Sequence, residues 1–172
     1  MTPSVSTVRI DDVVAIAESF EASAAKLYRQ AAESSSSRPE VRQTLLGLAE
    51  MEDSHLRAFT ELRHLLSNEG SARACTGREA ELLQAWLGRE VFADEGPPSP
   101  KVDLGQSVES WLDTAVGMEK ESIAFYSGMR SLVSEKHRRV LETIIEEEVY
   151  HLASLSYLLG SLRRGIPPGS SA

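Results

Sequence analysis

The sequence predicts an all-α protein built as a four-helix bundle, with a long crossover between the second and third helices. Three observations predict this fold class. Ala, Leu, Glu and Arg are abundant among the 172 residues and only 6% of the residues are aromatic, which favours helix over strand. Apolar residues recur at helical spacing in four long segments. A long stretch rich in helix breakers divides these segments into two pairs.

Start and stop signals mark the ends of the four expected helices. Asp11 and Asp12 are suitable N-caps for the first helix, because their short side chains accept hydrogen bonds from first-turn N–H groups. A serine run at 34–37 ends that helix, and Pro39 follows where a first-turn proline is tolerated. A Gly-Ile-Pro-Pro stretch ends the last helix. The helices are expected over residues 13–33, 39–66, 106–132 and 134–163.

Residues 70–105 form the expected crossover. They include a short predicted helix at 79–91 and a cluster of breakers at 96–100. Two helices, one long connection and two more helices, in a chain of this length, predict a single domain over residues 11–165. The flanking segments, 1–10 and 166–172, are expected to be flexible termini.

Charge and composition disfavour several classes of function. The net charge of -8 argues against a nucleic-acid partner, because the phosphate backbone favours a basic surface. No stretch of about 18 apolar residues predicts a membrane span, and residues 1–10 lack the apolar run of a signal peptide, so we expect a cytoplasmic location. The one cysteine, Cys75, permits neither an intramolecular disulfide nor a Cys-x-x-Cys metal site, and we interpret it as an incidental loop thiol.

An internal repeat relates the two pairs of helices. Each half contains a glutamate, a tyrosine seven residues later and, about thirty residues after the glutamate, a Glu-x-x-His motif. In the first half these residues are Glu21, Tyr28, Glu52 and His55; in the second half they are Glu119, Tyr126, Glu148 and His151.

The spacing places these polar residues on the apolar faces of the helices. Residues three apart share one helix face, and residues seven apart are separated by about two turns. Two antiparallel pairs would therefore bring four carboxylates and two imidazoles to one level of the core. Burying them without partners would be prohibitive, whereas two divalent cations balance the charge of the carboxylates. Four carboxylates and two imidazoles without sulfur suit iron or manganese better than structural zinc. The tyrosines are expected either as plain core residues or as hydrogen-bonding and electron-donating groups beside the ligands.

Neighbouring residues leave one alternative open. Glu50 and Glu146 also repeat, but they precede the chosen glutamates by two residues and should face elsewhere. Glu147 stands four residues before His151 and could replace Glu148 as the ligand. The remaining histidines lack such partners and are expected on the surface: His64 and His137.

This pattern, over residues 11–163, resembles the rubrerythrin-like branch of the ferritin-like superfamily of di-iron carboxylate proteins. The resemblance implies a ferritin-like bundle in which Glu52 and Glu148 bridge two metal ions. It also implies that Glu21 and Glu119 are terminal ligands and that each histidine binds one ion. Two iron ions are the expected cofactor, with manganese as the other candidate. The resemblance further implies a reaction with peroxide or dioxygen, an external electron donor and a homo-oligomer, for which we favour a dimer.

The sequence departs from this family at two points. Rubrerythrins proper carry an additional glutamate three residues after the terminal ligand of the third helix, where this chain has Ser122. They also carry a rubredoxin domain, for which this sequence has no cysteine pairs. Bacterioferritins place a haem-binding methionine directly after the second-helix glutamate; Asp53 stands there, so no haem is expected.

Three functions are consistent with this pattern. We rank first a non-haem di-iron oxidoreductase of peroxidase or ferroxidase type. The alternative is an iron-binding or storage protein that assembles, or is packaged in a protein shell, and handles iron without turnover. A small-molecule hydroxylase ranks last, because the sequence shows no substrate pocket. Residues 159–164 resemble peptides that load ferritin-like cargo into encapsulin shells, but we interpret them as the end of the fourth helix.

Overall fold

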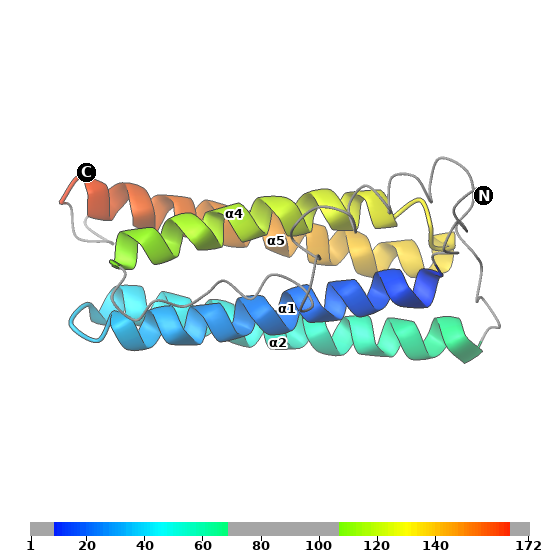
Figure 1. The fold of residues 1–172 in the computed structure, drawn as a ribbon. Coiled ribbons are helices and arrows are strands. Elements are labelled where there is room, and N and C mark those ends of the chain that lie inside the picture. The colour runs from blue at the N-terminus through cyan, green and yellow to red at the C-terminus, as the bar shows by residue number, and fades with distance from the viewer. Residues whose placement is uncertain (1–8, 69–106, 166–172) are drawn as a thin grey trace, which may run out of the picture.

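The computed structural model describes residues 9–68 and 107–165, and almost all of them form four long helices. These are α1 (Ile10–Ser34), α2 (Pro39–Asn68), α4 (Val108–Met129) and α5 (Glu135–Arg163). They lie side by side in a bundle (Figure 1), which confirms the predicted all-α four-helix fold. Within these described ranges, no helix is both long and apolar enough to cross a membrane. The predictions for Cys75, for the crossover segments 79–91 and 96–100, and for 1–8 and 166–172 lie outside the described residues.

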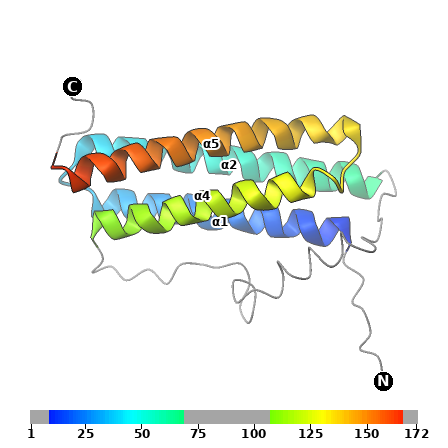
Figure 2. The ribbon, with the colours of Figure 1, turned by 90° about the horizontal axis from the view of Figure 1, so that it is seen from above.

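The helices form two antiparallel pairs, α1 with α2 and α4 with α5 (Figures 1 and 2). The pairs meet because α1 also contacts α4 and α2 also contacts α5. Figure 1 shows that α2 ends at one end of the bundle and that α4 begins at the opposite end. The end of α2 and the start of α4 therefore lie at opposite ends of the bundle.

The core consists of two apolar clusters separated by a layer of polar side chains. The first apolar cluster contains Phe59 and Leu141, and the second contains Leu45 and Leu155. On every helix, the residues of the two clusters are separated by one short stretch of buried polar residues. We call these residues the polar layer: Glu21, Glu52, His55, Glu119, Ser122, Glu148 and His151.

Several helix ends differ from those expected. α1 begins at Ile10, and Asp12 lies within its first turn, where the carboxylate accepts a hydrogen bond from the backbone N–H of Arg9 at 3.0 Å. The two aspartates therefore do not act as simple N-caps. α4 ends at Met129, earlier than expected, because the chain tightens into a turn in which the N–H of Leu132 bonds to the carbonyl of Met129 at 2.9 Å.

The surface position expected for His137 is wrong. This histidine is only 3% exposed, because it lies four residues before Leu141 on the face of α5 that packs into the core. His64 is exposed, as expected. The expectation for His137 was based on missing ligand partners, whereas the helical period alone places it on the buried face.

Candidate metal centre

The structure brings all six residues of the repeated motifs to the polar layer. Glu21 comes from α1, Glu119 from α4, and the Glu-x-x-His motifs come from α2 and α5. None of the six is more than 2% exposed. Each lies on a helix face that is otherwise apolar, so the packing that forms the bundle also directs these side chains inward.

Three carboxylate oxygens surround Nδ1 of His55. The distances are 3.0 Å to Oε1 of Glu148, 3.2 Å to Oε2 of Glu52 and 3.6 Å to Oε2 of Glu21. We call these four atoms the His55 group. They come from three helices, α1, α2 and α5, so the group exists only when the bundle is assembled.

A second set of atoms surrounds Nδ1 of His151. The distances are 2.9 Å to Oε1 of Glu52, 3.6 Å to Oε2 of Glu148 and 3.8 Å to Oε1 of Glu119. We call this set the His151 group. Glu52 and Glu148 each give one oxygen to the His55 group and the other oxygen to the His151 group. The arrangement therefore offers two adjacent positions, each with three oxygens and one nitrogen, joined by two shared carboxylates.

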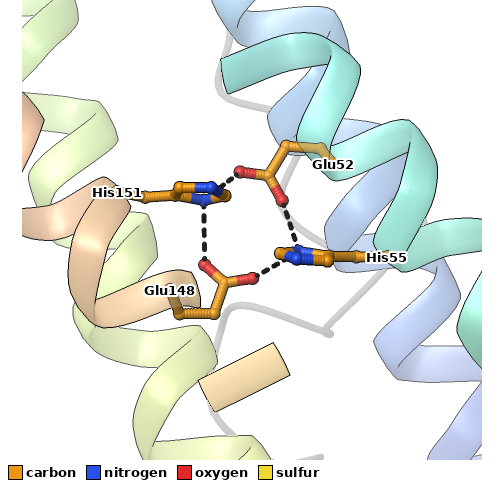
Figure 3. Close-up of side chains that lie close together, drawn as sticks. All are labelled: Glu52, His55, Glu148 and His151. Atoms are coloured by element: carbon orange, nitrogen blue, oxygen red, sulfur yellow. Dashed lines mark hydrogen bonds and ion pairs between the residues drawn. The ribbon is translucent and has the colours of Figure 1, made fainter. Parts of the chain in front are cut away.

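Figure 3 shows the central part of this arrangement, in which the two histidines and the two shared glutamates alternate around a ring. These four residues each offer one ligand atom within 4.8 Å of all the others. The imidazole rings are stacked, with centroids 5.4 Å apart and planes inclined by 24°. Four potential ligands that converge in the core are suited to metal binding.

Two buried tyrosines hold the remaining glutamates. The hydroxyl of Tyr126 donates a hydrogen bond to Oε1 of Glu21 at 2.6 Å, and the hydroxyl of Tyr28 donates to Oε1 of Glu119. Each tyrosine thus bonds to the glutamate of the other half of the chain, not to the glutamate that precedes it on its own helix. The hydrogen bonds therefore link α1 to α4 directly beside the donor groups.

Comparison with known proteins identifies the family and the fold of this chain. The sequence model of the rubrerythrin family matches residues 12–159, a range that contains all six motif residues. The chain belongs to the rubrerythrin family. Its fold is also similar to the crystal structure of a protein from Thermotoga maritima that is assigned as a ferritin-like diiron-carboxylate protein. The TM-score is 0.68, the identity is 20%, and the similarity covers 92% of this chain and 97% of that one, which shows a shared fold. No curated protein matches the sequence significantly.

The placement of the buried donor atoms supports a metal site in this rubrerythrin-family protein. Oε1 of Glu52, Oε1 of Glu148 and Nδ1 of His151 are buried and make no well-oriented hydrogen bond with the residues that the structure describes. Their nearest polar neighbours are other donor atoms of the two groups, such as Nδ1 of His151 and Oε1 of Glu52 at 2.9 Å. All three atoms point into the donor groups, where bound cations would satisfy them. The donor set therefore fits a pair of metal ions.

Burial and mutual contacts set the charges of the glutamates in the metal-free protein. Burial raises the pKa of Glu21 and of Glu119 well above the usual range, so these terminal carboxyls retain their protons more readily. Burial also acts on Glu52, but its contacts with His151 and His55 outweigh it and lower the pKa. Burial also acts to raise the pKa of Glu148, but contacts with Glu119 and both histidines outweigh it and lower the pKa. The two shared carboxylates therefore remain ionised.

The histidines supply the opposite charge. Burial lowers the pKa of His151, yet the neighbouring carboxylates of Glu148 and Glu52 raise it to about 9. The pKa of His55 is also raised, by Glu148, Glu21 and Glu52 against the effect of burial. In the metal-free state, two imidazolium ions thus face two carboxylates. Metal binding must displace these protons, because ligating histidines are neutral and ligating glutamates are ionised.

The sequence did not reveal two contacts of the polar layer. Ser122 donates a hydrogen bond to the carbonyl of Glu119 at 3.0 Å and lies 3.4 Å from Oε2 of Glu148. Glu147 lies outside both donor groups, and its Oε2 is 2.7 Å from Nε2 of His55. Glu148, not Glu147, thus faces the interior. The contacts of Ser122 with Glu148 and of Glu147 with His55 leave no sequence signal, because each joins residues on different helices. The other repeated pair, Glu50 and Glu146, is exposed as expected.

Proposed function

We propose that this rubrerythrin-family protein is a non-haem di-iron oxidoreductase that reduces hydrogen peroxide or dioxygen with electrons from an external donor. The observation that carries the proposal is the pair of donor groups around His55 and His151, joined by the shared carboxylates of Glu52 and Glu148. Two adjacent redox ions can act together on one oxidant, whereas a single ion supplies only one electron per oxidation step.

The donor atoms favour iron, with manganese as the second candidate. Each group offers three carboxylate oxygens and one imidazole nitrogen, without sulfur. Such oxygen-rich sites suit iron and manganese, and four-helix bundles with this ligand set hold pairs of these metals. In this assignment, Glu52 and Glu148 would bridge the two ions, whereas Glu21 and Glu119 would be terminal ligands.

The chain's own residues prepare the site for a small oxidant. When bound, two ferrous ions would supply the two electrons that, with two protons, convert one hydrogen peroxide to two water molecules. Tyr126 and Tyr28 hold the terminal carboxylates in place, and burial together with the nearby glutamates raises the pKa of both hydroxyls, so they remain donors. The first and second apolar clusters close the polar layer on both sides and keep bulk water out.

The cavity beside the donor groups fits only a small molecule. Its volume is about 10 Å³, which is close to the space that one water molecule needs. Phe20, Ala24 and Met118 line it together with residues of the polar layer. A space of this size leaves no room for an organic substrate beside the donor groups. The cavity therefore favours an oxidant-reducing enzyme over a hydroxylase.

Stopped-flow absorbance tests the proposal. Metal-free protein is loaded anaerobically with two ferrous ions per chain and then mixed with peroxide or with dioxygen-saturated buffer. We expect near-ultraviolet ferric absorbance to develop within seconds for at least one oxidant. Absence of this absorbance with both oxidants on any timescale would contradict the proposal.

A matched pair of variants makes the experiment specific to the polar layer. Glu148→Gln keeps the side-chain shape and removes a shared carboxylate, so most of the ferric absorbance should be lost. Glu146→Gln removes the same charge from an exposed position on the same helix and should leave the absorbance unchanged. If the protein instead takes up many more than two iron ions per chain and elutes as a large cage, iron storage replaces the enzymatic proposal.

A further inference from the structure

We propose that the two metal positions are unequal, and that the position beside His55 binds its ion first and more tightly because Glu147 orients His55. This inference rests on the proposed dinuclear site and assigns a positioning role to Glu147. It follows from a contact that is present at one histidine and has no counterpart at the other.

His55 is held from both sides. Its Nδ1 faces the His55 group, and its Nε2 lies 2.7 Å from Oε2 of Glu147 on α5. Because a carboxylate can only accept a hydrogen bond, Nε2 carries the hydrogen in this contact. With a metal ion in place, the contact therefore leaves the lone pair of Nδ1 directed at the ion. The side chain of Glu147 is 46% exposed, so this carboxylate connects the site to the surface of the bundle.

His151 lacks an equivalent partner. Its Nε2 is fully buried and makes no hydrogen bond with any residue in the described ranges. The repeat explains the difference: when Glu148 is placed over Glu52, Glu147 falls on Met51. A thioether is at best a weak acceptor, so the first half of the chain offers no carboxylate at the position that would serve His151.

The energetic consequence concerns metal affinity. A carboxylate that accepts the second N–H of a ligating histidine fixes its tautomer and ring orientation, and losing it costs about 10- to 100-fold in metal affinity. Glu147 should give this advantage to the His55 position alone. Metal loading should then proceed in two resolved steps of one ion each.

The test is an anaerobic titration of the metal-free, full-length protein with cobalt(II), followed by calorimetry and visible absorbance. Four variants compare the equivalent positions 51 and 147, which directly precede the two shared glutamates. Glu147→Met places methionine at both positions, Met51→Glu places glutamate at both, and the double variant exchanges the two residues. Glu146→Met makes the same chemical change as Glu147→Met at an exposed residue one position away.

We expect the wild type to bind two cobalt ions in two steps. Glu147→Met should weaken the first step by about 10- to 100-fold and bring the steps together, whereas Met51→Glu should tighten the second step. The double variant should restore two separate steps, and Glu146→Met should match the wild type. Proton magnetic resonance provides a readout that a general loss of rigidity in the bundle would not change. With one equivalent of cobalt, the wild type should show one hyperfine-shifted, solvent-exchangeable signal from an imidazole N–H. In Glu147→Met, this signal should shift or disappear.

Two equal steps in the wild type, or equal weakening of both steps in Glu147→Met, would overturn the inequality of the positions. Circular dichroism of each metal-free variant shows whether the helices are retained, and Met51→Glu tests the inference even if Glu147→Met folds poorly. Failure to bind any cobalt in the wild type would count against the proposed di-metal function as well. Equal steps would count only against the role of Glu147.

Discussion

At the scale of single residues, the terminal glutamates are held in different ways. Tyr126 binds Oε1 of Glu21 and leaves Oε2 to face His55 at 3.6 Å. Tyr28 binds Oε1 of Glu119, the same oxygen that faces His151 at 3.8 Å. Hydrogen bonds of this kind orient a ligand before the metal arrives. The tyrosines thus reduce the freedom that each glutamate would otherwise lose on binding an ion.

Replacing Tyr126 by phenylalanine tests this orientation. Tyr126→Phe removes the hydroxyl and leaves the ring, so the bundle should still fold. Because Glu21 loses its hydrogen bond, we expect the affinity for ferrous or cobalt(II) ions to fall about 10-fold in calorimetric titrations. Tyr157→Phe, at an exposed tyrosine of α5, is the matched control and should bind metal like the wild type. An unchanged affinity in Tyr126→Phe would mean that the tyrosine is only a packing residue.

The sequence predicted the candidate site where the spacing of residues along a helix determines which face of the helix they share. Glu52 and His55 are three residues apart on a helix, so their common face follows from the period. The repeat then identified the corresponding residues in the second half. The contact of Glu147 with His55 was not predictable, because it depends on how α5 is rotated against α2. Neither helix encodes that rotation in its own period.

At the scale of helices, the two apolar clusters provide most of the stabilisation of the bundle. Ion pairs also connect α1 and α2, including Arg63 with Glu18 at 3.2 Å, but their cations are substantially exposed. Such exposed pairs contribute little, about 0–1 kcal/mol each. Burial of large side chains contributes more, and Leu45 and Leu155 are fully buried in the second apolar cluster.

Truncating Leu45 tests whether the second apolar cluster contributes more to the free energy of unfolding than exposed positions do. Leu45→Ala removes a fully buried side chain from the second apolar cluster and should reduce the free energy of unfolding by about 2–5 kcal/mol. The measurement is chemical denaturation of the metal-free protein at fixed concentration. Leu65→Ala, on the exposed part of the same helix, should change the stability by no more than about 0.5 kcal/mol. Equal losses for the two variants would show that the second apolar cluster does not dominate.

The helices themselves were easier to predict than their ends. Apolar periodicity over four long segments indicated α1, α2, α4 and α5, because a buried stripe must repeat at the helical period. The ends depend on single hydrogen bonds instead. α1 begins before Asp12 because that carboxylate reaches back to the backbone N–H of Arg9, and no periodic signal marks such a choice.

At the scale of the whole molecule, the polar layer couples folding to metal binding. It lies between the two apolar clusters, so the bundle cannot form without burying four carboxyl groups and two imidazoles. In the metal-free protein, retained protons and imidazolium ions relieve part of the repulsion. In the metal-loaded protein, the ions do so. The chain should therefore be more stable with metal, since binding free energy adds to folding free energy.

The stabilisation of the protein by metal should increase as pH rises. The pKa of His151 is raised from 6.5 to about 9, so its stabilising charge is fully present below 6.5 and is lost as pH rises through about 9. The raised pKa values of Glu21 and Glu119 act in the same direction, because folding then disfavours loss of their protons. The metal-free protein should thus become less stable over this range.

Thermal melting with and without metal measures both effects. At saturating metal, the melting temperature should rise by about 10 °C. The difference between the two forms should grow as pH increases from 6.5 towards 9, the window set by the shift of His151. A difference that shrinks with rising pH would contradict the assigned protonation states. Identical melting of the two forms would mean that the six residues do not bind metal as one site.

Anomalous diffraction at the iron absorption edge tests the dinuclear site most directly. Crystals of the protein loaded anaerobically with ferrous iron should show two anomalous peaks per chain within the polar layer, about 3.5–4 Å apart. One peak should lie beside Nδ1 of His55 and the other beside Nδ1 of His151, with Glu52 and Glu148 between them. A single peak, no peak, or peaks that lie away from these two histidines would contradict the dinuclear site.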